Sequence, residues 1–167
     1  LVYDSDPASA EDTPHFAKVV RFRTSDDGRD AVSQKTVLDI REEQAPSHQI
    51  STLSIGPDGK LYVHLADGMQ PKTAQNLDSF LGKVLRVNLD GSPPRDNPFH
   101  DRSDGITPRD YVYAYGLRNP FGGAWRPSDE TLYLADNGPY MDRFARVPPG
   151  TNFGWDHTNE SMRNRAL

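Results

Sequence analysis

The chain has 167 residues, a formal net charge of −5 and no cysteine. This length suits a single domain, the acidic balance provides no basic surface for nucleic acid or anionic lipid, and the lack of cysteine excludes disulfides and thiolate metal sites. No stretch is apolar enough to cross a membrane, so no membrane insertion is expected. The abundance of glycine (13) and proline (14) is typical of a loop-rich β protein.

Short apolar runs of strand length follow one another along the chain, and many of them alternate apolar with polar residues. They are "FAKVVRFR" (16–23), "KTVLDI" (35–40), "STLSI" (51–55), "KLYVHLA" (60–66), "GKVLRVNL" (82–89), "DYVYAYG" (110–116), "GGAWR" (122–126), "TLYLA" (131–135) and "RFARV" (143–147). Turn signals such as "SDDG" (25–28) and "PDG" (57–59) separate them. Only 74–83 suggests one or two turns of helix, so the pattern predicts an all-β fold.

Two segments share one plan: a strand, a polar turn, a strand containing "LY", and Ala-Asp at its end. They are "STLSIGPDGKLYVHLADG" and "GGAWRPSDETLYLADNG", and a further strand follows each. Such repetition is typical of propeller blades, although a β-sandwich can also contain two similar hairpins. The opening "LVYDSDP" reads as the end of a strand running into a turn, so we expect a piece of a longer polypeptide.

Four collinear motifs resemble those of the soluble glucose/sorbosone dehydrogenases. They are "HQISTLSIGPDGKLYVHLADG", "LGKVLRVNLDGSPPRDNPF", "YAYGLRNPFGGAW" and "NGPYMDRFARVPPGTNFGW", within residues 48–156. Members of that family are six-bladed β-propellers that oxidise sugars with pyrroloquinoline quinone (PQQ) and calcium. The resemblance therefore implies that residues 1–167 form a partial β-propeller of about three blades, completed by the remaining blades or by self-association.

By this resemblance, His48 is the catalytic base that acts on the C1 hydroxyl of the sugar, and Asp67 orients it. An imidazole suits this task because it titrates near neutral pH. The alternatives are a bystander histidine at a strand mouth and an aspartate that only begins a turn. Ile50 adds bulk where the family usually has small residues. His64 is interpreted as an outward or inter-strand residue and not as a partner of Asp67.

The corners at the ends of later strands carry the other expected site residues. Arg118 and Asn119 match the family's PQQ-binding pair, since a guanidinium can clamp carboxylates and an amide can donate toward the quinone. Gly138 and Pro139 match the residues whose carbonyl oxygens bind calcium. Both corners can also be read as purely structural turns.

Asp142 matches an acidic residue near the sugar, whereas Arg143 replaces a second acidic residue of the family pattern. This replacement could alter an ion site or the substrate preference. Trp155 of "GTNFGW" is interpreted as core packing. The loop "NLDGSPPRDNP" lacks the terminal glutamate of an EF-hand and is read as a structural excursion.

These residues support three functions. The leading one is a sugar dehydrogenase segment that uses PQQ and calcium, is periplasmic or secreted like its family, and passes electrons to an unspecified acceptor. On its own the segment is expected to be inactive. The alternatives are a non-catalytic binding propeller that has lost the cofactor and a calcium-dependent lactone or ester hydrolase.

Overall fold

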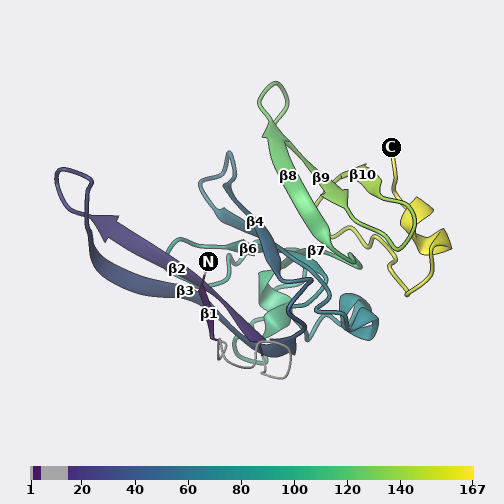
Figure 1. Ribbon diagram of the computed structural model, residues 1–167, viewed down its shortest axis with the longest axis horizontal. Helices are drawn as coiled ribbons and strands as arrows, with labels where there is room; N and C mark the ends of the chain where they lie inside the picture. The colour runs from purple at the N-terminus through teal and green to yellow at the C-terminus, as the bar shows by residue number, and fades with distance from the viewer. Residues whose placement is uncertain (1, 5–14) are drawn as a thin grey trace.

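The computed structural model describes residues 2–4 and 15–167, and the fold of these residues is all-β (Figure 1). Every strand expected from the sequence is present, whereas the expected helical turn lies earlier in the chain, at 71–75. The elements are β1 (Val2–Asp4), β2 (His15–Thr24), β3 (Ala31–Gln44), β4 (Ile50–Ile55), β5 (Leu61–Leu65), η1 (Pro71–Gln75), β6 (Lys83–Val87), η2 (Pro108–Tyr111), β7 (Val112–Tyr115), β8 (Pro120–Arg126), β9 (Thr131–Asp136), β10 (Arg143–Arg146) and η3 (Glu160–Arg163). In the described part of the chain, no helix has the length and apolar character needed to span a membrane. The turn expected after β1 falls outside the described residues.

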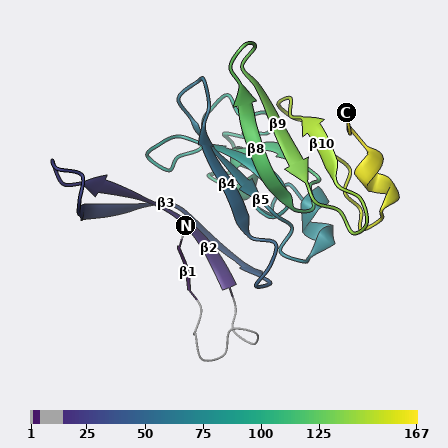
Figure 2. The same cartoon turned by 45° about the horizontal axis from the view of Figure 1, so that its top comes forward.

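The strands form three antiparallel sheets that follow one another along the chain: β1-β2-β3, β4-β5-β6-β7 and β10-β9-β8. In Figures 1 and 2 the sheets lie side by side, and the β2–β3 hairpin projects away from the rest. The two repeats of the sequence become equivalent hairpins, β4–β5 and β8–β9, each followed by a further strand in the same sheet. The repeat in the sequence therefore corresponds to a structural repeat, in which each copy forms the hairpin of one sheet.

The inner strands β5 and β6 of the middle sheet are buried on both faces because this sheet packs against a sheet on each side. Along a strand, successive side chains point to opposite faces. Leu61, Val63 and Leu65 of β5 belong to a cluster shared with β2 and β3. Tyr62 of the same strand belongs to a second cluster, which is shared with Leu132 and Leu134 of β9. The sheets thus stack face to face in series.

His64 is completely buried, so the expectation that it points outward is wrong. Its even position places it on the face of β5 that meets the third sheet, where it packs against Gly123 of β8. Neither ring nitrogen has a hydrogen-bond partner within the described residues. Burial without a partner disfavours the charged imidazole and lowers the pKa of His64 to about 4.

The polar excursion at 92–109 is held to the middle sheet by buried and half-buried hydrogen bonds. The Arg86 guanidinium donates to Asp58, Asp96 and Asn97. The Asn97 amide in turn donates to the carbonyl oxygens of Arg86 and Asp110. These bonds attach the excursion to the sheet from which it leaves.

Replacing Gly123 by alanine should destabilise the fold, because an added Cβ would lie 2.1 Å from Cε1 of the buried His64. We expect G123A to lower the free energy of unfolding by about 1–3 kcal/mol, the usual cost of overpacking. G122A is the matched control, since nothing lies within 4 Å of a Cβ at that position. Denaturant unfolding of both variants checks this, and equal stabilities would contradict it.

Acid should destabilise the protein through His64. The unfolded imidazole takes up a proton near pH 6.5 and the folded one near pH 4, so the unfolded state binds more protons between these values. This contribution to stability is intact above pH 6.5 and falls by about 3 kcal/mol as the pH drops to 4. Between pH 6.5 and pH 4, the free energy of unfolding of H64F should therefore fall by about 3 kcal/mol less than that of the wild type. Urea unfolding at both pH values measures the difference. An identical loss in both proteins would contradict the assignment.

Candidate functional site

A cavity of about 210 Å³ opens where the loops at one edge of the second and third sheets meet. His48 precedes β4, Asp67 follows β5, Arg118 precedes β8 and Pro139 follows β9. Because each pair of strands is antiparallel, the start of one and the end of the next lie at the same sheet edge. The cavity is lined by His48, Asp67, Met69, Pro71, Arg118, Pro139, Trp155 and His157. The structure therefore brings together His48, Asp67, Arg118 and Pro139, four of the residues selected from the sequence.

His48 and Asp67 form a direct pair in this cavity. Nδ1 of His48 lies 2.7 Å from Oδ1 of Asp67, and the His48 side chain is only 9% exposed. An ionised carboxylate can only accept, so Nδ1 carries the proton and Nε2 of the neutral ring has a free lone pair. This tautomer leaves Nε2 able to accept a proton.

The Asp67 carboxylate is buried and is hydrogen-bonded to its own turn and to two distant segments of the chain. Besides His48, its Oδ1 accepts the backbone N–H of Met69 at 3.0 Å. Its Oδ2 accepts the indole N–H of Trp155 at 2.9 Å. Trp155 is thus buried as expected, and in addition it holds the carboxylate that orients His48.

A second buried carboxylate, Asp136, fixes the corner that carries Arg118 and Asn119. It accepts the backbone N–H of Asn119 at 2.7 Å and that of Arg118 at 3.3 Å. From the other side, the Asp67 backbone N–H donates to the Arg118 carbonyl oxygen at 2.8 Å. The corner is therefore held between the ends of two equivalent strands, β5 and β9.

Arg143 is completely buried beside Asp136, with which it forms a salt bridge of 2.7 Å. Its guanidinium also donates to four backbone carbonyl oxygens, those of Gly116, Phe153, Ser161 and Asn164. Burial raises the pKa of Asp136, whereas Arg143 and the two backbone N–H groups oppose that rise. Arg143 thus acts as an internal anchor, and its charge is matched inside the fold.

Lys83 anchors the opposite wall of the cavity, where η1 carries Pro71. Its buried ammonium group donates to the carbonyl oxygens of Thr73 at 2.8 Å and Ala74 at 3.2 Å. Burial lowers the pKa of Lys83 to about 7. The Lys83 side chain of β6 therefore fixes the position of η1.

The remaining sequence-selected residues do not line the His48 cavity. Asn119 and Asp142 line a second cavity, of about 370 Å³, together with Asn137. Oδ1 of Asp142 accepts from the Asn137 amide at 2.7 Å and from the Gly138 N–H at 3.1 Å, so Asp142 closes the turn that contains Gly138 and Pro139. A Cβ on Gly138 would lie 2.0 Å from the Met141 carbonyl oxygen, so this turn requires glycine.

The two cavities share the same pair of loops. Nη1 of Arg118 donates to the Asn137 carbonyl oxygen at 2.9 Å and to its side-chain oxygen at 3.1 Å. The Arg118 guanidinium also stacks 5.7 Å from the centre of the Trp155 ring. Its Nε and Nη2 groups donate no hydrogen bond to the described residues. These free donors leave the guanidinium able to bind an anionic group.

Three non-glycine residues of the His48 cavity have left-handed backbone conformations. Their φ angles are 62° for His48, 64° for Met69 and 77° for His157. Such a conformation costs about 1–3 kcal/mol per residue and concentrates at functional sites. The sequence interpretation had not selected Met69, Pro71 or His157, because no local pattern marks them.

Comparison with known proteins agrees with this architecture. The sequence profile of the family described as "Glucose / Sorbosone dehydrogenase" matches residues 1–165. The aldose sugar dehydrogenase YliI of Escherichia coli is 33% identical over 135 residues, which are 80% of this chain and 36% of that protein. The quinoprotein glucose dehydrogenase B of Acinetobacter calcoaceticus is 31% identical over 157 residues, covering 82% of this chain and 32% of that protein.

A solved structure, the PQQ-bound aldose sugar dehydrogenase of Streptomyces coelicolor, superposes with a TM-score of 0.72 at 27% identity. The match covers 92% of this chain and 46% of that one. The chain thus spans about a third of the length of the curated relatives it matches.

Sheets stacked face to face, with the loops of one rim converging on a cavity, define a β-propeller. The chain belongs to the glucose/sorbosone dehydrogenase family and covers about three of the blades of its six-bladed fold. The fold class expected from the sequence is confirmed.

Removing the indole N–H of Trp155 should destabilise the protein, because it leaves Oδ2 of the buried Asp67 without that donor. We expect W155F to lower the free energy of unfolding by about 1–3 kcal/mol. W125F is the matched control, since the Trp125 indole donates to Ser54 over 3.3 Å at a half-buried site. Chemical unfolding of both variants measures the difference, and an equal effect would speak against a structural role for this bond.

Proposed function

We propose that this chain supplies one part of the active site of a sugar dehydrogenase that uses PQQ and calcium. The observation that carries the proposal is the His48–Asp67 pair, which shares a cavity with Arg118. The proposal concerns residues 1–167 as about half of a propeller. The remaining blades complete the site, and the enzyme acts in the periplasm or outside the cell, as the family resemblance implies.

His48 is the general base of the proposed reaction. With Nδ1 held by Asp67, Nε2 takes the proton of the C1 hydroxyl of an aldose while the hydride leaves C1. When bound, PQQ supplies the acceptor for that hydride, and the sugar becomes a lactone. Asp67 stabilises the imidazolium that forms, because its carboxylate lies 2.7 Å from the ring.

The donors of the Arg118–Asn119 corner fit a cofactor that carries carboxylates and quinone oxygens. Arg118 keeps Nε and Nη2 free of hydrogen bonds to the described residues, and a planar guanidinium suits carboxylates. The Asn119 amide makes no hydrogen bond within the described part of the chain, so its N–H₂ group can donate to a carbonyl oxygen. These two residues would hold PQQ.

The turn at Gly138 and Pro139 fits a hard cation such as calcium, which binds carbonyl oxygens. Asp142 fixes this turn by accepting from the Gly138 N–H at 3.1 Å. A cation there would offset negative charge on the neighbouring cofactor. Asp142 would also face the sugar from the second cavity, where it lies with Asn119.

The altered stretch after His48, with the bulk of Ile50, and the presence of Arg143 are the sequence features that favoured a binding propeller without cofactor. In the structure Ile50 begins β4, is 7% exposed and packs in the hydrophobic cluster shared with β2 and β3. It is not among the residues that line the His48 cavity. Its side chain therefore takes no space from the proposed cofactor site, and the dehydrogenase function is favoured.

Replacing His48 by alanine should lower kcat for aldose oxidation by about 10²–10⁴-fold in the complete propeller, the usual contribution of a general base. PQQ binding, followed by its absorbance, should remain. H100A is the control, because His100 also lies close to a buried carboxylate, 2.7 Å from Asp110, but is outside the cavity. The assay is reduction of a dye acceptor by sugar in the presence of PQQ and calcium.

A base role for His48 is wrong if H48A turns over sugar as fast as H100A. Residues 1–167 alone should be inactive with PQQ and calcium, because the other cofactor contacts come from further blades. Strong activity of this segment by itself would contradict the partial-site proposal. Failure of the complete propeller to bind PQQ at micromolar concentration would favour the binding-propeller alternative.

A further inference from the structure

His157 stands out in the cavity because its backbone is strained and its ring is exposed. Its φ angle of 77° is in the left-handed region, where glycine would be preferred. Nothing in its local structure demands a histidine, since its imidazole makes one described contact, with the Trp155 ring at 6.0 Å between centroids. A residue kept in a costly conformation with a free polar ring points to a function of that ring.

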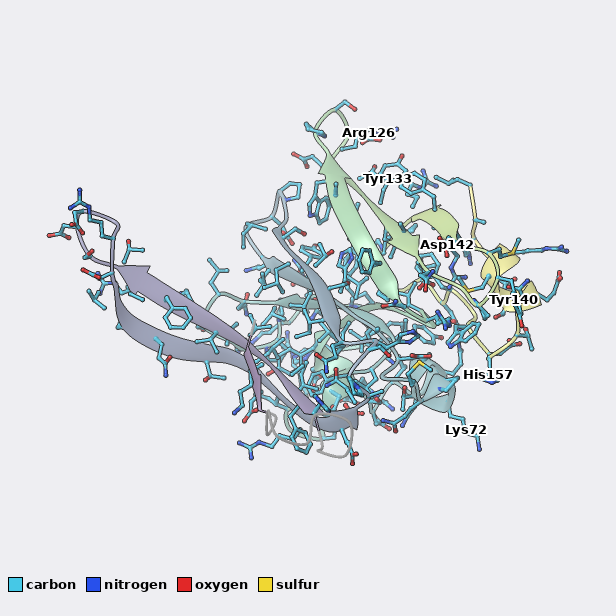
Figure 3. All side chains as sticks on the ribbon, viewed as in Figure 1. Lys72, Arg126, Tyr133, Tyr140, Asp142 and His157 are labelled. Carbon is cyan, nitrogen blue, oxygen red and sulfur yellow. The ribbon has the colours of Figure 1, made fainter. Side chains whose placement is uncertain are left out.

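The loop around His157 is held rigidly by its neighbours. Asp156 accepts from the backbone N–H of Thr158 at 2.9 Å and from its hydroxyl group. Ser161 closes the loop by donating from its hydroxyl to the Thr158 carbonyl oxygen at 2.7 Å. Figure 3 shows His157 beside η1, which carries Lys72, at the edge of the molecule. The ring is therefore presented at the mouth of the cavity on a fixed backbone.

His157 is also connected to the proposed base through a short chain of contacts. Its ring lies against Trp155, whose indole N–H holds Asp67, and Asp67 holds His48. The two histidines line one cavity from different segments of the chain. Arg118 is a permanent cation and suits anionic groups. A neutral imidazole can both donate and accept a hydrogen bond, as a sugar hydroxyl can, so it suits a sugar.

We propose that the His157 imidazole contacts the sugar substrate by hydrogen-bonding one of its hydroxyl groups at the mouth of the cavity. This inference rests on the proposed function and adds a specificity residue to it. His157 orients the sugar and takes no part in proton transfer. Its loss should therefore raise KM and leave kcat nearly unchanged, because it removes binding common to the ground and transition states.

The test uses H157A and H157G in the complete propeller with PQQ, calcium and D-glucose. Loss of one neutral hydrogen bond should raise KM about three- to tenfold in both variants, with kcat and PQQ affinity within about twofold of wild type. H157G should also raise Tm by a few degrees, roughly 2–5 °C, because glycine relieves the left-handed backbone. E130G is the matched control: Glu130 has a φ of 55° in the β8–β9 turn, so it should raise Tm without changing KM.

Unchanged KM in both His157 variants would overturn the inference, and weakened PQQ binding would instead assign His157 to the cofactor. Calorimetric titration with D-glucose, with and without PQQ, separates this inference from the proposed function. If the wild type binds glucose without oxidising it and H157A binds it several-fold more weakly, the substrate contact stands and the dehydrogenase function fails. If glucose binding is equal in wild type and H157A, the inference fails whatever the activity.

Discussion

Two buried carboxylates at equivalent strand ends hold the cavity together. Asp67 and Asp136 both follow the Ala that ends the "LY" strand of each repeat, and both are at most 1% exposed. Asp67 is paired with the side chains of His48 and Trp155 and with the N–H of Met69 in its own turn. Asp136 is paired with the side chain of Arg143 and with the N–H groups of Arg118 and Asn119. A buried carboxylate is tolerated only when its oxygens are paired, so neither loop can move without a large desolvation cost. The loop that carries Arg118 is attached to both, which fixes its distance from His48.

The fold could be predicted from the sequence because its strands are short, alternating and separated by strong turn signals. The face of a buried strand was harder to assign. Every position of β5 is buried, so period-two alternation does not separate core from solvent, and His64 was interpreted as an outward or inter-strand residue. The His48–Asp67 pair was found through family spacing. His157 and Trp155 were not recognised as site residues because they lie about 90 residues away from Asp67 and reach the cavity only when the sheets stack. A left-handed φ at a non-glycine residue also leaves no mark in the sequence.

Backbone strain in this protein is concentrated where the loops meet. Of the five described non-glycine residues with left-handed φ, His48, Met69 and His157 line one cavity. Their cost, about 1–3 kcal/mol each, must be offset by the surrounding packing and hydrogen bonds. Packing between the stacked sheets, which buries both faces of β5 and β6, supplies that stabilisation away from the site. A rigid array of sheets can therefore hold loop residues in conformations that a less constrained scaffold would release.

Arg143 illustrates how the fold can neutralise a charge that lies next to a site residue in the sequence. The family resemblance predicts an acidic residue at this position, so that arginine would alter the local charge by two units beside Asp142. In the structure the guanidinium is completely buried, is paired with Asp136 and donates to four carbonyl oxygens. The positive charge of Arg143 is therefore neutralised within the fold. The charged groups that line the cavities still include Asp142 and Arg118. Arg143 joins the third sheet to the segment that carries Trp155, so it supports the scaffold near the point where the indole reaches Asp67.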